Sequence, residues 1–129
     1  MINEVYVSYE IAMLLKEKGF REECKMYWWK SPKDEHIDTA DTDYYADFNE
    51  GDSYLVGCEC SAPTLQTVLK WLREIHGYEI NVEYFPECEH YRDYSYKRGS
   101  DWKSTSFKWF DTWEACAESA IKYILEYAL

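Results

Sequence analysis

Residues 60–77 read C-S-A-P-T-L-Q-T-V-L-K-W-L-R-E-I-H-G, and this stretch predicts the central helix of the chain. Ser61 offers a capping oxygen before the first turn, and Gly77 stands where a left-handed C-terminal cap falls. We expect Trp71 on the flank of this helix. Side chains recur at steps of three and four residues, the spacing that lines one helix face, and they are Leu65, Val68, Leu69, Leu72, Ile75 and His76.

Shorter patterns on both sides of this stretch predict two more helices and several strands. A first helix is expected over residues 8–18, capped by Ser8, and a last helix from Asp111, which stands in a capping-box relation to Glu114. Alternating side chains predict strands at 24–30, 54–59 and 78–85, and a further strand or hairpin within 91–110.

The predicted order is helix, strand, strand, helix, strand, strand, helix. This order favours an α+β fold, a two-layer sandwich in which three helices cover a mostly antiparallel sheet of about four strands. The length of 129 residues suits one domain, residues 1–129. Residues 34–53 hold eight acidic side chains and no Lys or Arg, so we expect a long acidic loop there.

Charge and cysteine content limit the partners and the compartment. With a formal net charge of −11, the chain is not expected to bind duplex nucleic acid, because binding to phosphates needs clustered Lys and Arg. Five cysteines, an odd number, predict free thiols in a reducing cytoplasm. Residues 1–8 lack the pattern of a signal peptide, and no apolar run is long enough for a membrane span.

Three thiols and an imidazole form the best candidate for a metal site. Cys58 and Cys60 precede the central helix, and Cys88 and His90 follow the next predicted strand. This is the ligand set of a Cys₃His zinc site, although the one-residue spacing is shorter than such sites usually have. The alternative is that Cys58 and Cys60 are small buried hydrophobic residues. No other cofactor is indicated.

A basic and aromatic segment, residues 91–109, is the candidate for binding nucleic acid. Bases stack on aromatic rings while cations follow the phosphate backbone, so such a segment suits a single strand. The alternative is an exposed hairpin whose lysines protect a sheet edge. The candidate residues are Tyr91, Arg92, Tyr94, Lys97, Arg98, Trp102, Lys103 and Lys108.

The acidic stretch is the candidate surface for a protein partner. Its carboxylates and aromatic rings together suit a protein contact, whereas the alternative is a solvated loop. The abundance of Tyr and Trp, 13 and 6 residues, is also compatible with a homodimer. The candidate residues are Asp38, Asp41, Asp43, Tyr44, Tyr45 and Asp47.

Several segments resemble a known family. They are residues 62–66, A-P-T-L-Q, residues 70–74, K-W-L-R-E, residues 7–12, V-S-Y-E-I-A, and residues 120–123, A-I-K-Y. Together they resemble a family of small proteins common in Bacteroides-type gut bacteria and their prophages. The resemblance implies a bacterial or phage cytoplasmic setting and carries over no activity, cofactor or catalytic residue.

These observations favour a non-enzymatic protein that binds an unidentified protein partner. No cysteine or histidine has the context of a nucleophile and its base, and the five glycines are too scattered for a phosphate-binding loop. The other hypotheses are a single-stranded nucleic-acid-binding module and a zinc-stabilised domain.

Overall fold

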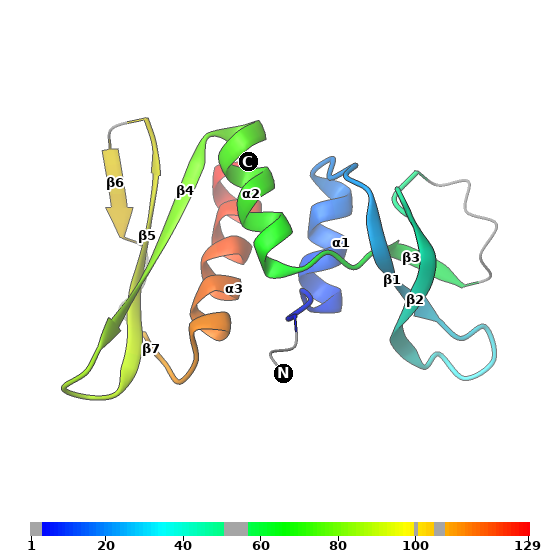
Figure 1. Cartoon of the computed structure of the whole chain (residues 1–129), viewed down its shortest axis with the longest axis horizontal. Helices are drawn as coiled ribbons and strands as arrows, with labels where there is room; N and C mark the ends of the chain where they lie inside the picture. Colours follow the sequence, from blue (N-terminus) through cyan, green and yellow to red (C-terminus); the bar gives the residue numbers. More distant parts are fainter. Residues whose placement is uncertain (1–3, 51–56, 100, 105–107) are drawn as a thin grey trace. The chain divides into compact units, whose positions relative to one another are not determined.

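A computed structural model of the chain describes residues 4–50, 57–99, 101–104 and 108–129 (Figure 1). These residues form an α+β fold with three α-helices and two antiparallel sheets of three and four strands, one of which is a half-barrel. The α+β class and the antiparallel pairing are as predicted, but the strands form two sheets instead of one. The chain divides into two compact units, an N-terminal unit of residues 4–64 and a C-terminal unit of residues 65–129.

The N-terminal unit consists of one helix and a three-stranded sheet in the order β2-β1-β3. The hydroxyl of Ser8 caps the helix as predicted, accepting a hydrogen bond from the Ile11 N–H at 3.3 Å. Phe20 and Leu15 are fully buried in the core of the unit. The elements are α1 (Tyr9–Glu17), β1 (Cys24–Lys30), β2 (Ile37–Ala46) and β3 (Cys58–Ser61).

Half of the predicted acidic loop, residues 34–53, is strand β2. It pairs antiparallel with β1, with Lys30 opposite Ile37 and Met26 opposite Asp41. The prediction of a loop was wrong over Ile37–Ala46 because an edge strand does not need the alternation of apolar and polar residues by which we recognised strands. Of the strand predicted at 54–59, residues 54–56 lie outside the described part of the chain, and β3 begins at Cys58.

A buried polar network holds the segment after β2 against the rest of the N-terminal unit. The Asn49 amide donates to the Phe20 carbonyl at 2.8 Å and accepts from the Ser61 N–H at 2.9 Å. The Ser61 hydroxyl accepts from the Phe48 N–H at 3.1 Å. Ser61 therefore belongs to β3 and to this network, and the prediction that it caps the central helix was wrong.

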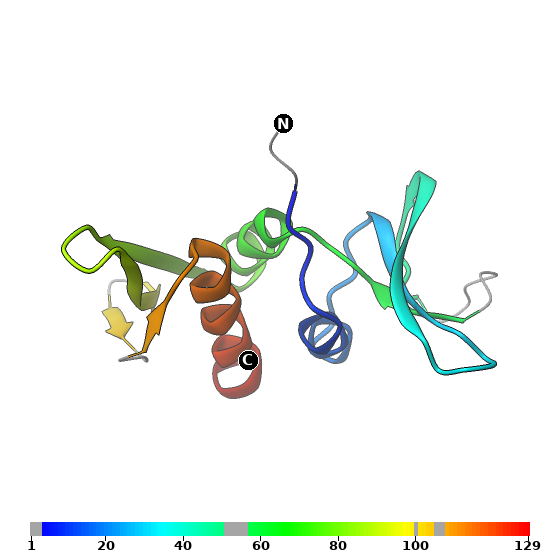
Figure 2. The ribbon, with the colours of Figure 1, turned by 90° about the horizontal axis from the view of Figure 1, so that it is seen from below.

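The C-terminal unit combines helices with a four-stranded sheet in which β5 pairs with β4 on one side and with β6 and β7 on the other. Helix α3 packs on β4 and β5 and also contacts α2, as Figures 1 and 2 show. The elements are α2 (Leu65–His76), β4 (Tyr78–Phe85), β5 (His90–Arg98), β6 (Asp101–Ser104), β7 (Trp109–Phe110), α3 (Trp113–Tyr123) and the π-helix η1 (Ile124–Ala128).

The central helix has the predicted C-terminus but a shifted core face. Gly77 has a φ of +75°, the left-handed conformation that favours glycine. Leu72 is buried as expected, whereas Ile75 is 61% exposed and Trp71 is buried. The Trp71 ring packs edge-on against the His76 ring, with centroids 4.5 Å apart. Both faces satisfy the helical period, and the large indole ring occupies the buried one.

The last helix is capped one residue later than predicted. The Thr112 hydroxyl, and not Asp111, accepts the hydrogen bond from the Ala115 N–H, at 3.1 Å. The Asp111 carboxylate instead lies 2.9 Å from Nε2 of His90 at the start of β5. Among the helices of the described residues, none is long and apolar enough to cross a membrane.

Candidate functional site

The four predicted metal ligands lie in different units. Cys58 and Cys60 are on β3 of the N-terminal unit, and Cys88 and His90 lie in and after the β4–β5 turn of the C-terminal unit. Cys60 is fully buried, and this desolvation raises the pKa of its thiol to about 12. Within the part of the chain that the structure describes, no three His, Cys, Asp or Glu side chains come together to hold a metal ion.

Cys88 in the β4–β5 turn, His90 at the start of β5 and Asp111 before α3 have an arrangement unsuited to nucleophilic catalysis. The Nδ1 atom of His90 lies 2.5 Å from the Cys88 carbonyl oxygen, and its Nε2 atom faces Asp111. The Cys88 thiol lies 3.8 Å from the Phe85 carbonyl oxygen. Since an oxygen acceptor faces each ring nitrogen, the imidazole presents no free base to the thiol.

The predicted protein-binding residues lie on and just after β2. Tyr44 and Tyr45 are 55% and 67% exposed. Asp47 follows the strand and forms an ion pair with Arg21. The other three carboxylates, Asp38, Asp41 and Asp43, are exposed on the strand itself.

The predicted nucleic-acid-binding residues have different environments. Lys97 pairs with Glu79 at 3.8 Å, and the Tyr91 ring packs on Tyr84 with centroids 4.9 Å apart. Lys108 is exposed just before β7. The side chains of Arg92, Tyr94 and Trp102 lie outside what the structure describes.

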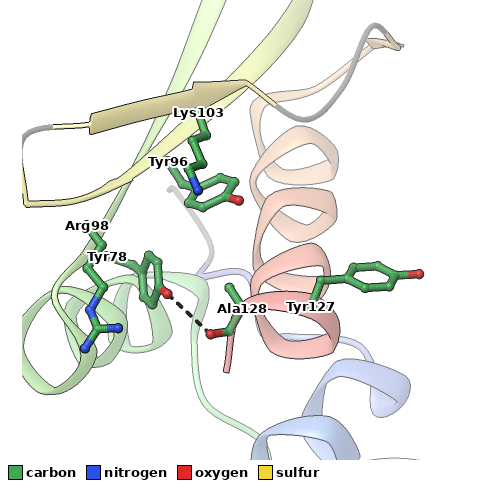
Figure 3. A pocket seen from close by; sticks show the side chains of 6 residues that line it. All are labelled: Tyr78, Tyr96, Arg98, Lys103, Tyr127 and Ala128. Carbon is green, nitrogen blue, oxygen red and sulfur yellow. Dashed lines mark hydrogen bonds between the residues drawn. The ribbon is translucent and has the colours of Figure 1, made fainter.

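Arg98 and Lys103 are among the residues that line a cavity of about 350 Å³ in the C-terminal unit, together with three tyrosines (Figure 3). Figure 3 shows the Lys103 side chain directed from β6 into the region of Tyr96, while the Tyr127 ring reaches outward from η1. The lining residues are Tyr78, Tyr96, Arg98, Lys103, Tyr127 and Ala128.

Contacts between the lining residues fix the inner wall of this cavity. The Tyr78 hydroxyl donates to the Ala128 carbonyl at 3.3 Å, which ties β4 to η1. The Tyr78 and Tyr96 rings are buried, with centroids 5.9 Å apart, and the Arg98 guanidinium lies 5.7 Å from the centre of the Tyr78 ring. The cavity is therefore both aromatic and cationic.

The chain matches no protein-family model, no curated protein and no solved structure. The candidate sites consequently rest on the geometry of this chain.

Sequence reasoning identified Arg98 and Lys103 but missed Tyr78, Tyr96 and Tyr127. The two strand tyrosines resemble ordinary core residues, because their positions fit the alternation of β4 and β5. Tyr127 carries a usable signal, since it lies on the last helix outside the apolar stripe that Ile124 and Ala128 continue. An aromatic ring on a polar helix face is a reason to look for a ligand.

Proposed function

We propose that this chain acts by binding another protein through the edge strand β2, and that the partner contributes a basic strand. The observation that carries the proposal is the place of β2 in the sheet. It lies at the edge of the three-stranded sheet, whose strand order is β2-β1-β3, and among the described residues its only strand partner is β1. The free N–H and C=O groups of an edge strand can pair with a strand from another chain.

The charge of β2 favours a basic partner. The side chains of Asp38 and Asp41 are each 61% exposed, and the nearest cation to Asp41, Lys25, is 4.0 Å away. Residues 4–64 contain 14 acidic and six basic residues, a formal net charge of −8. The electrostatic field of this negative charge attracts a positively charged partner and raises the rate of association.

A bulge separates the pairing part of β2 from an aromatic part. Between the pairs Met26–Asp41 and Cys24–Ala46, β2 has more residues than β1. Oγ1 of Thr42 lies 2.7 Å from the Lys25 carbonyl oxygen and 2.6 Å from that of Tyr44, which holds the bulge in place. We infer that a partner strand pairs along Ile37–Asp41 and that Tyr44 and Tyr45 pack against its side chains.

The family resemblance supports the setting that we propose for this interaction. It is the cytoplasm of a bacterium, with the chain encoded by the bacterium, a phage or a mobile element. The role is non-enzymatic.

A charge-neutral variant of β2 tests the proposal. We expect proteins that immobilised wild-type chain retains from a bacterial lysate at low salt to be retained about tenfold less by the variant Asp38→Asn/Asp41→Asn/Asp43→Asn. The matched control is Glu74→Gln/Glu83→Gln/Glu87→Gln, which removes the same charge from exposed positions of the C-terminal unit.

Equal retention by wild type and the β2 variant would contradict the proposal, as would an equal loss in the control variant. A β2 variant that aggregates and still retains the partner would also contradict it. The role of the aspartates would then be to prevent β2 from pairing with β2 of another copy, and not to attract the partner.

A further inference from the structure

Strand β4 is an edge of the four-stranded sheet and lies in a different unit from β2. It stands at one end of the order β4-β5-β6, and among the described residues it pairs with β5 alone. The opposite edge consists of β6 and β7, which have four and two residues, and β6 carries the exposed Lys103. Short strands and lysines protect an edge against further pairing. With eight residues and neither Lys nor Pro, β4 lacks these protections.

The bulge of the β4–β5 pair is in β5 and leaves β4 uninterrupted. Between the pairs Asn81–Ser95 and Glu83–Arg92, the chain advances by two residues in β4 and by three in β5. A bulge in an edge strand bends that strand away from a neighbour, and here the edge strand is the regular one. The N–H and C=O groups on the outer side of β4 can therefore pair with a further strand.

The side chains of β4 alternate between an apolar face and a polar face. Ile80 and Val82 pack against α3 but are only half-buried, and Tyr84, the next residue on that face, is 49% exposed. The opposite face carries three exposed polar side chains, which are Glu79, Asn81 and Glu83. A further strand that covers the apolar row and leaves the polar row in water must have the same alternation as β4.

The charges of β4 are compensated more than those of β2. The Glu79 carboxylate pairs with Lys97 of β5 at 3.8 Å, and a Glu83 carboxylate oxygen lies 3.5 Å from Nδ2 of Asn81. On β2, by contrast, Asp38 and Asp41 are each 61% exposed. The edge at β4 therefore suits a strand of little net charge, whereas the edge at β2 suits a basic one.

We propose that β4 pairs antiparallel with β4 of a second copy of this chain, with Val82 at the two-fold axis. In this register Ile80 lies opposite Tyr84 of the second copy, which continues the apolar row across the joined sheet. On the polar face Asn81 lies opposite Glu83 of the second copy, and an amide N–H can donate to that carboxylate.

The other registers of this pair are less favourable. A two-fold axis at Asn81 would place Glu79 opposite Glu83, and an axis at Glu83 would place that carboxylate opposite its own copy. An axis at Ile80 would join only residues 78–82 of each strand, whereas the axis at Val82 joins residues 79–85. A shift by one residue would place apolar side chains opposite polar ones.

Sedimentation velocity of the purified chain tests the proposal at concentrations from about 5 to 500 µM and about 0.15 M salt, which screens the net charge. Because a single pair of strands buries little surface, we expect a reversible dimer with a Kd of about 10–100 µM. Asn81→Lys, which introduces a cation opposite Glu83 of the second copy, should tighten the dimer about three- to tenfold. Asn81→Glu should weaken it by about the same factor.

The matched controls are Gln66→Lys and Gln66→Glu, which make the same changes in charge at an exposed position of α2 and should leave the Kd unchanged. A tighter dimer with Asn81→Lys cannot result from a damaged fold, so the pair of variants separates pairing from stability.

A chain that stays monomeric at about 500 µM would overturn the proposal. So would equal effects of the Asn81 and Gln66 variants. A dimer that responds to Asp38→Asn/Asp41→Asn/Asp43→Asn and not to the Asn81 variants would also overturn it, since self-association would then belong to β2. The binding of another protein by β2 is measured separately and does not depend on any of these results.

Discussion

The two units of this chain combine helix and antiparallel sheet in different ways. The N-terminal unit has one helix, and the buried amide of Asn49 bonds a coil segment to Phe20 and Ser61. The C-terminal unit has α2 and α3, whose apolar faces supply most of its buried side chains. The N-terminal unit thus adds a buried hydrogen-bond network to its apolar core, whereas the buried side chains of the C-terminal unit come mainly from two amphipathic helices.

The units also differ in charge and in their candidate sites. Residues 65–129 contain 11 acidic and eight basic residues, a net charge of −3, against −8 for residues 4–64. The exposed edge of the N-terminal unit is acidic, and the cavity of the C-terminal unit is lined by two cations. The two candidate sites thus differ in the charge of the side chains around them.

The largest expected effect is on the core of the C-terminal unit. Leu72→Ala should lower the free energy of unfolding by about 2–5 kcal/mol, because it leaves a cavity where a fully buried side chain was. Urea denaturation followed by tryptophan fluorescence measures this change. Ile75→Ala, on the exposed side of the same helix, should cost less than about 0.5 kcal/mol. A large loss with Ile75→Ala would mean that the apolar stripe read from the sequence is the buried one.

A somewhat smaller effect is expected from the polar network of the N-terminal unit. Asn49→Ala leaves the Phe20 carbonyl and the Ser61 N–H without their partner, at a cost of about 2–4 kcal/mol. Amide hydrogen exchange should be faster in the Asn49→Ala variant than in wild type, and this increase should be larger in residues 4–64 than in residues 65–129. Asn81→Ala, an exposed asparagine of β4, is the matched control. Unchanged exchange in residues 4–64 would contradict a stabilising role for the network.

The smallest effect is a loss of stability at alkaline pH that arises in the N-terminal unit. Burial raises the pKa of Cys24 from 9.0 to about 11 and that of Cys60 to about 12. Above pH 9 the unfolded chain loses protons that the folded chain keeps, so the free energy of unfolding falls as the pH rises. The loss is about 1 kcal/mol per thiol at pH 10.

Urea midpoints at pH 7, 9 and 10 measure this dependence. Cys24→Ala and Cys60→Ala should each lose part of the decrease, whatever their stability at pH 7. A wild-type midpoint that does not fall between pH 9 and pH 10 would contradict the assignment.

Local sequence patterns predicted some strands with their correct bounds and missed another. The predicted bounds of β1 and β4 agree with the structure, because each strand carries a strong alternation ended by Pro32 or Pro86. Strand β2 was missed because it is an edge strand whose side chains are all exposed or half-buried. Polar composition alone therefore indicated a loop where pairing with β1 makes a strand.

The candidate cavity could be predicted only in part. Arg98 and Lys103 stood out as cations in an acidic chain, but nothing local connects Tyr78 with Tyr127, which are far apart in the sequence. That both line one cavity depends on the pairing of β4 with β5 and on the packing of α3 against both strands.

The sequence by itself determined the helix within residues 60–77, its stop at Gly77 and the α+β class, because periodicity and glycine conformation act over a few neighbouring residues. Only the tertiary structure decided that Trp71 is buried and Ile75 exposed, since both satisfy the helical period and the packing partners select between them. It also assigned Ser61 to a strand and Thr112 to the cap of α3. These choices depend on hydrogen-bond partners, and the nearby sequence offers more than one residue able to make each bond.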